Sequence, residues 1–191
     1  IIALVGSAHG ALANVYYAAK TGNDSNTCAQ AQDSATAKLT IRAALACVGS
    51  GVDVGAGHTV IVKEGTYDEY FDNIIPGGTS WATPFTLMAS PGEVVTLHPN
   101  HPGWRVMTTT DIGYVVIEGF RIDGSTTPYE AIKLDCRYQN GLDVVPGTCT
   151  HHVRLKNLEI VNTEGGGINL GGDGSDHELI GLKIRDCGLR V

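Results

Sequence analysis

The segment GGDGSDHEL (residues 171–179) has the residue types and spacing of a calcium-binding turn. Four positions match the glycine-rich nonapeptide G-G-x-G-x-D, which binds calcium between successive turns: Gly171, Gly172, Gly174 and Asp176. The sequence holds one copy of this motif, and Glu178 stands where the motif requires a large aliphatic residue. One interpretation is therefore calcium bound through Asp173 and Asp176. The other is a glycine-rich turn in which Asp176 hydrogen-bonds its own backbone.

A second group of polar residues is built around two short apolar segments, AIKL (residues 131–134) and GINL (residues 167–170). Because side chains alternate along a strand, Lys133 and Asn169 should point away from the core that their aliphatic neighbours face. If the two segments stack as adjacent strands, Lys133 and Asn169 lie about 4.8 Å apart, and Asp135 follows Lys133 on the same face. An ordinary solvated strand face has the same composition, so the pattern alone does not require chemistry.

The elements that would position these residues repeat along the chain. One pattern of alternating apolar and polar residues occurs three times, as YVVIEGFRIDG (114–124), HVRLKNLEIVN (152–162) and HELIGLKIRDC (177–187). Each copy alternates like a half-buried strand, and a Gly or Asn interrupts it where the chain must bend. Four columns match when the copies are aligned: Ile117, Leu155 and Leu179; Gly119, Asn157 and Gly181; Phe120, Leu158 and Leu182; Ile122, Ile160 and Ile184. Units of this size bury their apolar faces only by stacking, so the repeats predict an all-β solenoid.

The remaining segments fit the same architecture. Residues 34–51 contain the predicted helix, which we expect to cover the open end of the solenoid core. Thr40 is its predicted N-cap, and its apolar stripe consists of Ile41, Ala44, Leu45 and Val48. The residues predicted to occupy equivalent positions in successive coils are Val60, Val106, Ile132 and Ile168. Residues 70–83 and 135–151 are interpreted as loops outside the coils.

Composition and charge restrict the possible functions. The 191 residues include 25 glycines, as a turn-rich chain requires, and residues 14–191 are predicted to form one domain. A net charge of −7 without a Lys/Arg cluster argues against nucleic-acid binding, and no stretch is apolar for long enough to span a bilayer. Residues 1–13 are typical of the end of a secretory signal peptide, with a first core strand as the alternative. We expect the solenoid to continue beyond Val191.

Five cysteines are consistent with export, and their spacing does not match a zinc site. Four cysteines allow three pairings, of which we predict two bonds. Cys28–Cys47 would tie the amino-terminal loop to the helix, and Cys136–Cys149 would close the loop between two repeats. Cys187 is left over, either to pair beyond residue 191 or to remain a free thiol.

Histidines and tryptophans are further candidates. His151, His152 and His177 precede the repeated strands at matching places in two coils, but the sequence has no His pair spaced i, i+4 with a carboxylate. Metal binding there is not favoured. Trp81 and Trp104 are interpreted either as platforms for sugar rings or as local core under long loops.

The entry segments resemble a known family. They are NVYYAAKTGNDSN (14–26), KLTIRAALACV (38–48), GHTVIVKEGTYDE (57–69) and PFTLMASPGEVVTL (84–97). With the repeats that follow, they resemble right-handed parallel β-helix proteins of the pectate-lyase-like superfamily over residues 14–191. The chain departs at Gly57-His58, where members often carry Gly-Asp. The resemblance implies an all-β, right-handed parallel β-helix with one amino-terminal capping helix, but a fold does not settle function.

The resemblance also implies a site. Lyases of that superfamily bind substrate along the outer face of one sheet and use a basic residue to remove the proton α to a uronate carboxylate. Calcium or an Arg neutralises that carboxylate. By this resemblance the outward row is Met107, Lys133 and Asn169. The candidate residues are Lys133 and Arg137 for catalysis, Asn169 and Asp135 for substrate binding, and Asp173 and Asp176 for calcium.

The expected protein is a secreted monomer that acts as a polysaccharide lyase on an acidic polysaccharide. A glycoside hydrolase is a further alternative. The main alternative from another class is a non-catalytic module for glycan binding or surface adhesion.

Overall fold

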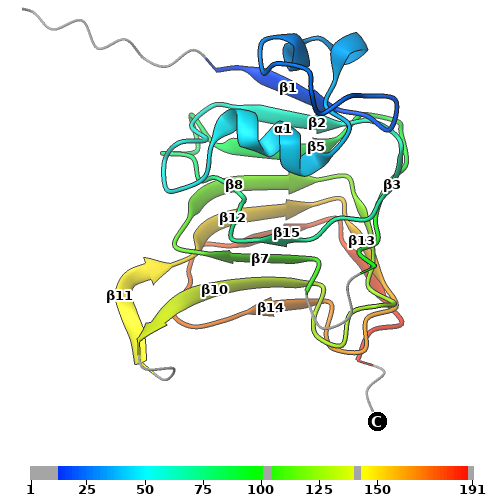
Figure 1. Cartoon of the computed structure of the whole chain (residues 1–191). Coiled ribbons are helices and arrows are strands. Elements are labelled where there is room, and N and C mark those ends of the chain that lie inside the picture. The colour runs from blue at the N-terminus through cyan, green and yellow to red at the C-terminus, as the bar shows by residue number, and fades with distance from the viewer. Residues whose placement is uncertain (1–12, 101–104, 140–142, 189–191) are drawn as a thin grey trace, which may run out of the picture.

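The computed structural model describes residues 13–100, 105–139 and 143–188, which form a parallel β-helix with three sheets around one core (Figure 1). Residues 1–12 of the predicted signal-peptide segment lie outside the described residues, and so does Trp104. The first sheet contains β1 (Val15–Ala18), β2 (Thr59–Val62), β5 (Phe85–Ala89), β8 (Gly113–Glu118), β12 (His151–Lys156) and β15 (Glu178–Ile180). The second contains β4 (Phe71–Asp72), β7 (Met107–Thr110), β10 (Ile132–Gln139), β11 (Asp143–Cys149) and β14 (Ile168–Leu170). The third contains β3 (Gly65–Tyr67), β6 (Val95–Leu97), β9 (Arg121–Asp123), β13 (Glu159–Val161) and β16 (Lys183–Arg185).

The stacking register of the three repeats is confirmed. Leu155 pairs with Ile117 on one side and with Leu179 on the other, and Ile160 lies between Ile122 and Ile184 in the same way. All three residues of the Gly/Asn column are left-handed, with φ of 84°, 52° and 62° for Gly119, Asn157 and Gly181. Gly and Asn adopt this conformation at the least cost, which explains their place at the corner between the first and third sheets.

The core is a continuous set of aliphatic and aromatic side chains that point inward from all three sheets. Ile132 is fully buried and Leu134 is 2% exposed, whereas Leu170, which pairs with Leu134, is 49% exposed. No described strand stacks on the far side of β14, so its inward side chains are covered on one side only.

The predicted helix is confirmed as α1 (Ile41–Val48), preceded by two 3-10 turns, η1 (Gln30–Gln32) and η2 (Ser34–Thr36). The Thr40 hydroxyl accepts a hydrogen bond from the Ala43 N–H, as an N-cap does. The Glu69 carboxylate accepts from the N–H groups of Ile41 and Arg42, both at 2.8 Å. The apolar side of α1 packs on β1 and β2 at the amino-terminal end of the solenoid, as expected of a cap (Figure 1).

Two parts of the predicted register are wrong. Val60 belongs to the first sheet and not to the sheet that holds Ile132, and Met107 rather than Val106 pairs with Ile132. Val106 and Met107 are consecutive apolar residues and both are buried, so the apolar pattern does not indicate which of them pairs with Ile132. The predicted loop 135–151 is largely an antiparallel hairpin, in which β10 extends beyond its parallel partners and β11 folds back on it.

Both predicted disulfides, Cys28–Cys47 and Cys136–Cys149, are confirmed, and Cys187 has a free thiol. Among the described residues, no helix is long and apolar enough to cross a membrane.

Candidate functional site

The outer side of the second sheet brings the predicted site residues together. Lys133 pairs with Asn169 on one neighbouring strand and with Thr108 on the other, and Thr108 in turn pairs with Asp72. The predicted adjacency of Lys133 and Asn169 is therefore confirmed. Met107 is not part of this row, because it pairs with Ile132 and is 1% exposed. We call the outward residues the lysine face: Asp72, Thr108, Thr110, Lys133, Asp135, Arg137 and Asn169.

Lys133 is held in an ion pair on this face. Its Nζ lies 2.6 Å from Asp135 Oδ2, and the two side chains are only 22% and 11% exposed. The Tyr138 hydroxyl donates a 3.1 Å hydrogen bond to Asp135 Oδ1, and this bond raises the pKa of the Tyr138 phenol. A Cβ at Gly171 would lie 2.7 Å from Asp135 Oδ1, so the absence of a side chain there makes room for the carboxylate. Lys133 is thus an ammonium with a fixed partner rather than a freely solvated side chain.

Arg137 lies further along β10 and is the more accessible cation. Its side chain is 61% exposed, and its Nη2 lies 2.9 Å from Asp111 Oδ2. Arg137 and Asp111 line a cavity of about 110 Å³ with Asn73 and Thr110, whose hydroxyl donates to Asn73 Oδ1. This cavity could admit a small polar group, such as a carboxylate, against the guanidinium.

Two residues of this arrangement were not predicted from the sequence. Tyr138 reaches Asp135 because the β10–β11 register shifts between Cys136 and Tyr138, which breaks the alternation that the prediction assumed. Asp111 lies beyond the end of β7 in a left-handed conformation, with φ of 58°. An Asp after the end of a polar strand is only a weak indication of a functional site, because turns favour Asp as well.

The glycine-rich segment forms a turn between β14 and β15. Asp176 accepts a 2.8 Å hydrogen bond from the Ser175 hydroxyl, and its carboxylate lies 3.8 Å from His152 Nε2. Asp173 lines a cavity of about 220 Å³ with Ser175 and His151. Within the described ranges, no three His, Cys, Asp or Glu side chains are grouped so that they could hold a metal ion.

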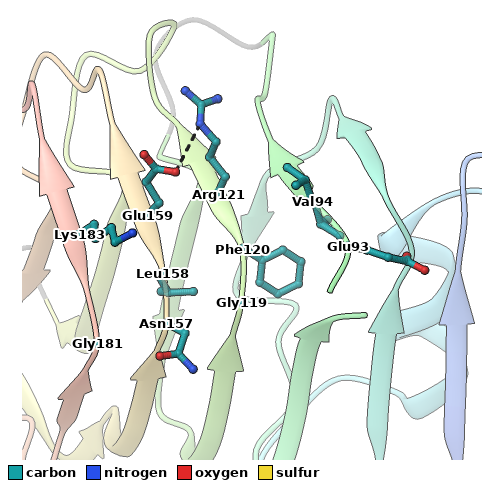
Figure 2. Close-up of a pocket in the computed structure, with 11 residues that line it drawn as sticks. Glu93, Val94, Gly119, Phe120, Arg121, Asn157, Leu158, Glu159, Gly181 and Lys183 are labelled. Carbon is teal, nitrogen blue, oxygen red and sulfur yellow. Dashed lines mark ion pairs between the residues drawn. The ribbon is translucent and has the colours of Figure 1, made fainter. Parts of the chain in front are cut away.

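A cavity of about 350 Å³ lies at a different corner and takes no part in the lysine face (Figure 2). The column of Gly119, Asn157 and Gly181 lines it, and Figure 2 shows Arg121 and Glu159 turned toward each other above this column. Glu159 is also paired with Arg185 at 2.9 Å.

Comparisons with known proteins assign no family to the chain. No model of a protein family matches the chain. No curated protein matches it either. Among solved structures, a rhamnogalacturonan lyase is similar with a TM-score of 0.49 and 14% sequence identity, over 90% of this chain and 51% of that one. The chain spans about half the length of that structure, and similarity at this level carries no argument about activity.

Proposed function

We propose that this protein is a secreted polysaccharide lyase that acts on an acidic, uronate-containing polysaccharide along the lysine face. The supporting observation is that Lys133, Asp135 and Arg137 lie on one outer strand face, beside Asn169 and a small polar cavity. Lys133 and Arg137 are two cations on this face of a chain with a net charge of −7, and a uronate carboxylate would compete with Asp135 and Asp111 for them. The resemblance to parallel β-helix lyases assigns chemistry to the same residues.

In this proposal Lys133 removes the proton α to the uronate carboxylate. The electron pair of that C–H bond forms a carbon–carbon double bond, and the glycosidic C–O bond at the β carbon breaks. The leaving oxygen takes a proton from water, and Lys133 returns the proton that it removed to the solvent. Arg137 neutralises the carboxylate, while Asn169 and Asp135 bind and orient the sugar. A base needs a free lone pair, so in this proposal the Lys133 amine acts after it has left its ion pair with Asp135.

One observation favours a second candidate, a glycan-binding module without catalysis. Both cations are paired with carboxylates, Lys133 with Asp135 and Arg137 with Asp111. A polar face of hydroxyl, amide and balanced ionic groups is sufficient for binding and does not require an activated base. This candidate predicts binding of the polymer without formation of unsaturated ends.

The test measures unsaturated-product absorbance with the purified chain on polygalacturonate, alginate and glycosaminoglycans, from neutral to alkaline pH, with and without calcium. Lys133→Ala and Arg137→Ala should each abolish turnover, and exposed Lys183→Ala should leave it unchanged. Binding without product supports the second candidate. The absence of both binding and product on every polymer contradicts both.

Three further expectations belong to this proposal. The two disulfides fit an oxidising compartment and therefore a secreted protein. The protein is expected to be a monomer. Calcium at Asp173 and Asp176 stays a prediction, and direct calcium titration of wild type and Asp173→Asn/Asp176→Asn tests it.

A further inference from the structure

A cluster of rings lies where β8 and β12 begin, and the proposed lyase chemistry does not use it. We call it the aromatic–histidine cluster: Trp81, Tyr114, His151 and His152. The Tyr114 and His152 rings are 4.6 Å apart at 34°, and Trp81 meets Tyr114 edge-on at 5.7 Å. The His151 and His152 rings are 5.0 Å apart, with a 2.8 Å hydrogen bond between their Nδ1 atoms. Three segments distant in sequence thus contribute to one patch of partly exposed rings.

The backbone under this cluster is left-handed in three successive coils. Tyr114, His152 and Asp176 occupy one column of the stack, because Val115 pairs with Val153 and Arg154 pairs with Glu178. All three are left-handed, with φ of 54°, 51° and 59°. Of the other left-handed columns, one consists of Gly119, Asn157 and Gly181, and another contains Asn162 and Asp186. These residue types adopt the conformation cheaply, whereas a bulky Tyr there is a true outlier. Such strain concentrates at functional sites, so these side chains have a use that offsets its cost.

The rings are held in place before any ligand arrives. Trp81 projects from a turn closed by a bridge between Ser80 and Thr83, whose hydroxyl oxygens lie 3.1 Å apart. Arg154 lies over the Trp81 ring, 4.2 Å from its centroid, and donates two hydrogen bonds to the Glu178 carboxylate at 2.9 and 2.7 Å. A fixed platform loses little conformational entropy on binding, and flat apolar rings with polar edges suit a sugar ring.

The charges at the cluster indicate which sugar it suits. Glu178 neutralises Arg154, and the Asp176 carboxylate, whose side chain is 61% exposed, lies beside His152. Burial, and then the neighbouring His152, lower the pKa of His151, so that His151 is uncharged at neutral pH. Among the described residues of the cluster and its neighbours, the arginine, Arg154, is already paired with Glu178, so a uronate carboxylate would meet Asp176 without an unpaired arginine. We propose that the aromatic–histidine cluster is a second glycan-binding site, specific for neutral sugar residues.

This proposal does not depend on lyase activity, and its test is separate. Tryptophan fluorescence and calorimetric titrations should use neutral β-1,4-linked galacto-, gluco- and xylo-oligosaccharides, with oligogalacturonate as the acidic probe. We expect binding of at least one neutral series, weakened 10-fold or more by Trp81→Ala and by Tyr114→Gly. Tyr114→Gly also removes a side chain from a left-handed position, so its thermal unfolding temperature should not fall despite the loss of binding.

The matched control is Tyr129→Ala. Tyr129 is also partly exposed and lies under an arginine, with Arg105 Cζ 4.8 Å from its ring centroid and paired to Glu130 at 2.7 Å. This variant and Lys133→Ala should leave neutral-sugar binding unchanged. Three results would overturn the proposal: no neutral oligosaccharide binds, Trp81→Ala weakens only oligogalacturonate binding, or the histidines bind Zn²⁺ while Trp81→Ala changes no sugar affinity. Loss of turnover in Lys133→Ala with intact neutral-sugar binding separates this site from the lysine face.

Discussion

Replacing Lys133 by Met should show how much the Lys133–Asp135 ion pair contributes to the free energy of unfolding. The substitution keeps the apolar stem and removes the charge. Among the described residues, this leaves the Tyr138 hydroxyl as the side-chain partner of the Asp135 carboxylate. Exposed ion pairs contribute about 0.2–1 kcal/mol, whereas breaking a buried pair from one side costs about 3–5 kcal/mol. With side chains 22% and 11% exposed, this pair lies between these cases. We expect Lys133→Met to lower the free energy of unfolding by about 2 kcal/mol.

Urea denaturation of a double-mutant cycle measures this effect. Asp135→Asn keeps the shape of the side chain and an oxygen that accepts from Tyr138, so the double variant Lys133→Met/Asp135→Asn should be more stable than Lys133→Met alone. Lys183→Met, an exposed lysine, is the control and should change stability by less than about 0.5 kcal/mol. If Lys133→Met is as neutral as the control, or if the two substitutions are additive, then Lys133 is a solvated side chain and the reasoning fails.

Three further predictions concern the core, the cap and pH. Ile132→Ala should lower the free energy of unfolding in urea by about 2–5 kcal/mol, because Ile132 is fully buried. Leu170 is 49% exposed, so Leu170→Ala should lower it clearly less. Equal losses for the two variants would contradict the stacking. Glu69→Ala should lower the free energy of unfolding by about 1–2 kcal/mol, because it leaves two N–H groups of α1 without their acceptor. Glu64→Ala is the exposed control and should not shift the unfolding midpoint. Burial lowers the pKa of His151 below 6.5, so the unfolded chain binds the proton first and stability should fall as pH drops through the range below 6.5. Thermal unfolding at pH 8 and pH 5 should show a smaller loss in His151→Asn, and an identical loss would refute the assignment.

The repeated columns could be predicted because each signal is local. Alternation fixes the faces of Ile122 and Ile160, and the need for a left-handed residue explains Gly119 and Asn157 in the sequence itself. Alternation does not say to which of three sheets a strand belongs, which is why Val60 was placed in the wrong sheet.

The site was predicted less completely for a related reason. The pattern predicts Lys133 and Asp135 on one face, but the contact between Tyr138 and Asp135 follows a register shift that alternation does not encode. The contact between Trp81 and Tyr114 joins a turn to a later strand, and no periodicity encodes such a contact.

The disulfide between Cys136 and Cys149 has a practical consequence for producing this protein. Cys136 directly follows Asp135 on β10, and the bond fastens β10 to β11, a strand whose ladder partner is β10. In a reducing bacterial cytosol this bond does not form. We therefore expect such material to keep its stacked core, and its circular dichroism spectrum, while the hairpin that carries Arg137 and Tyr138 is less well fixed. An inactive preparation from that source would not test the proposed site, whereas protein exported to an oxidising compartment would.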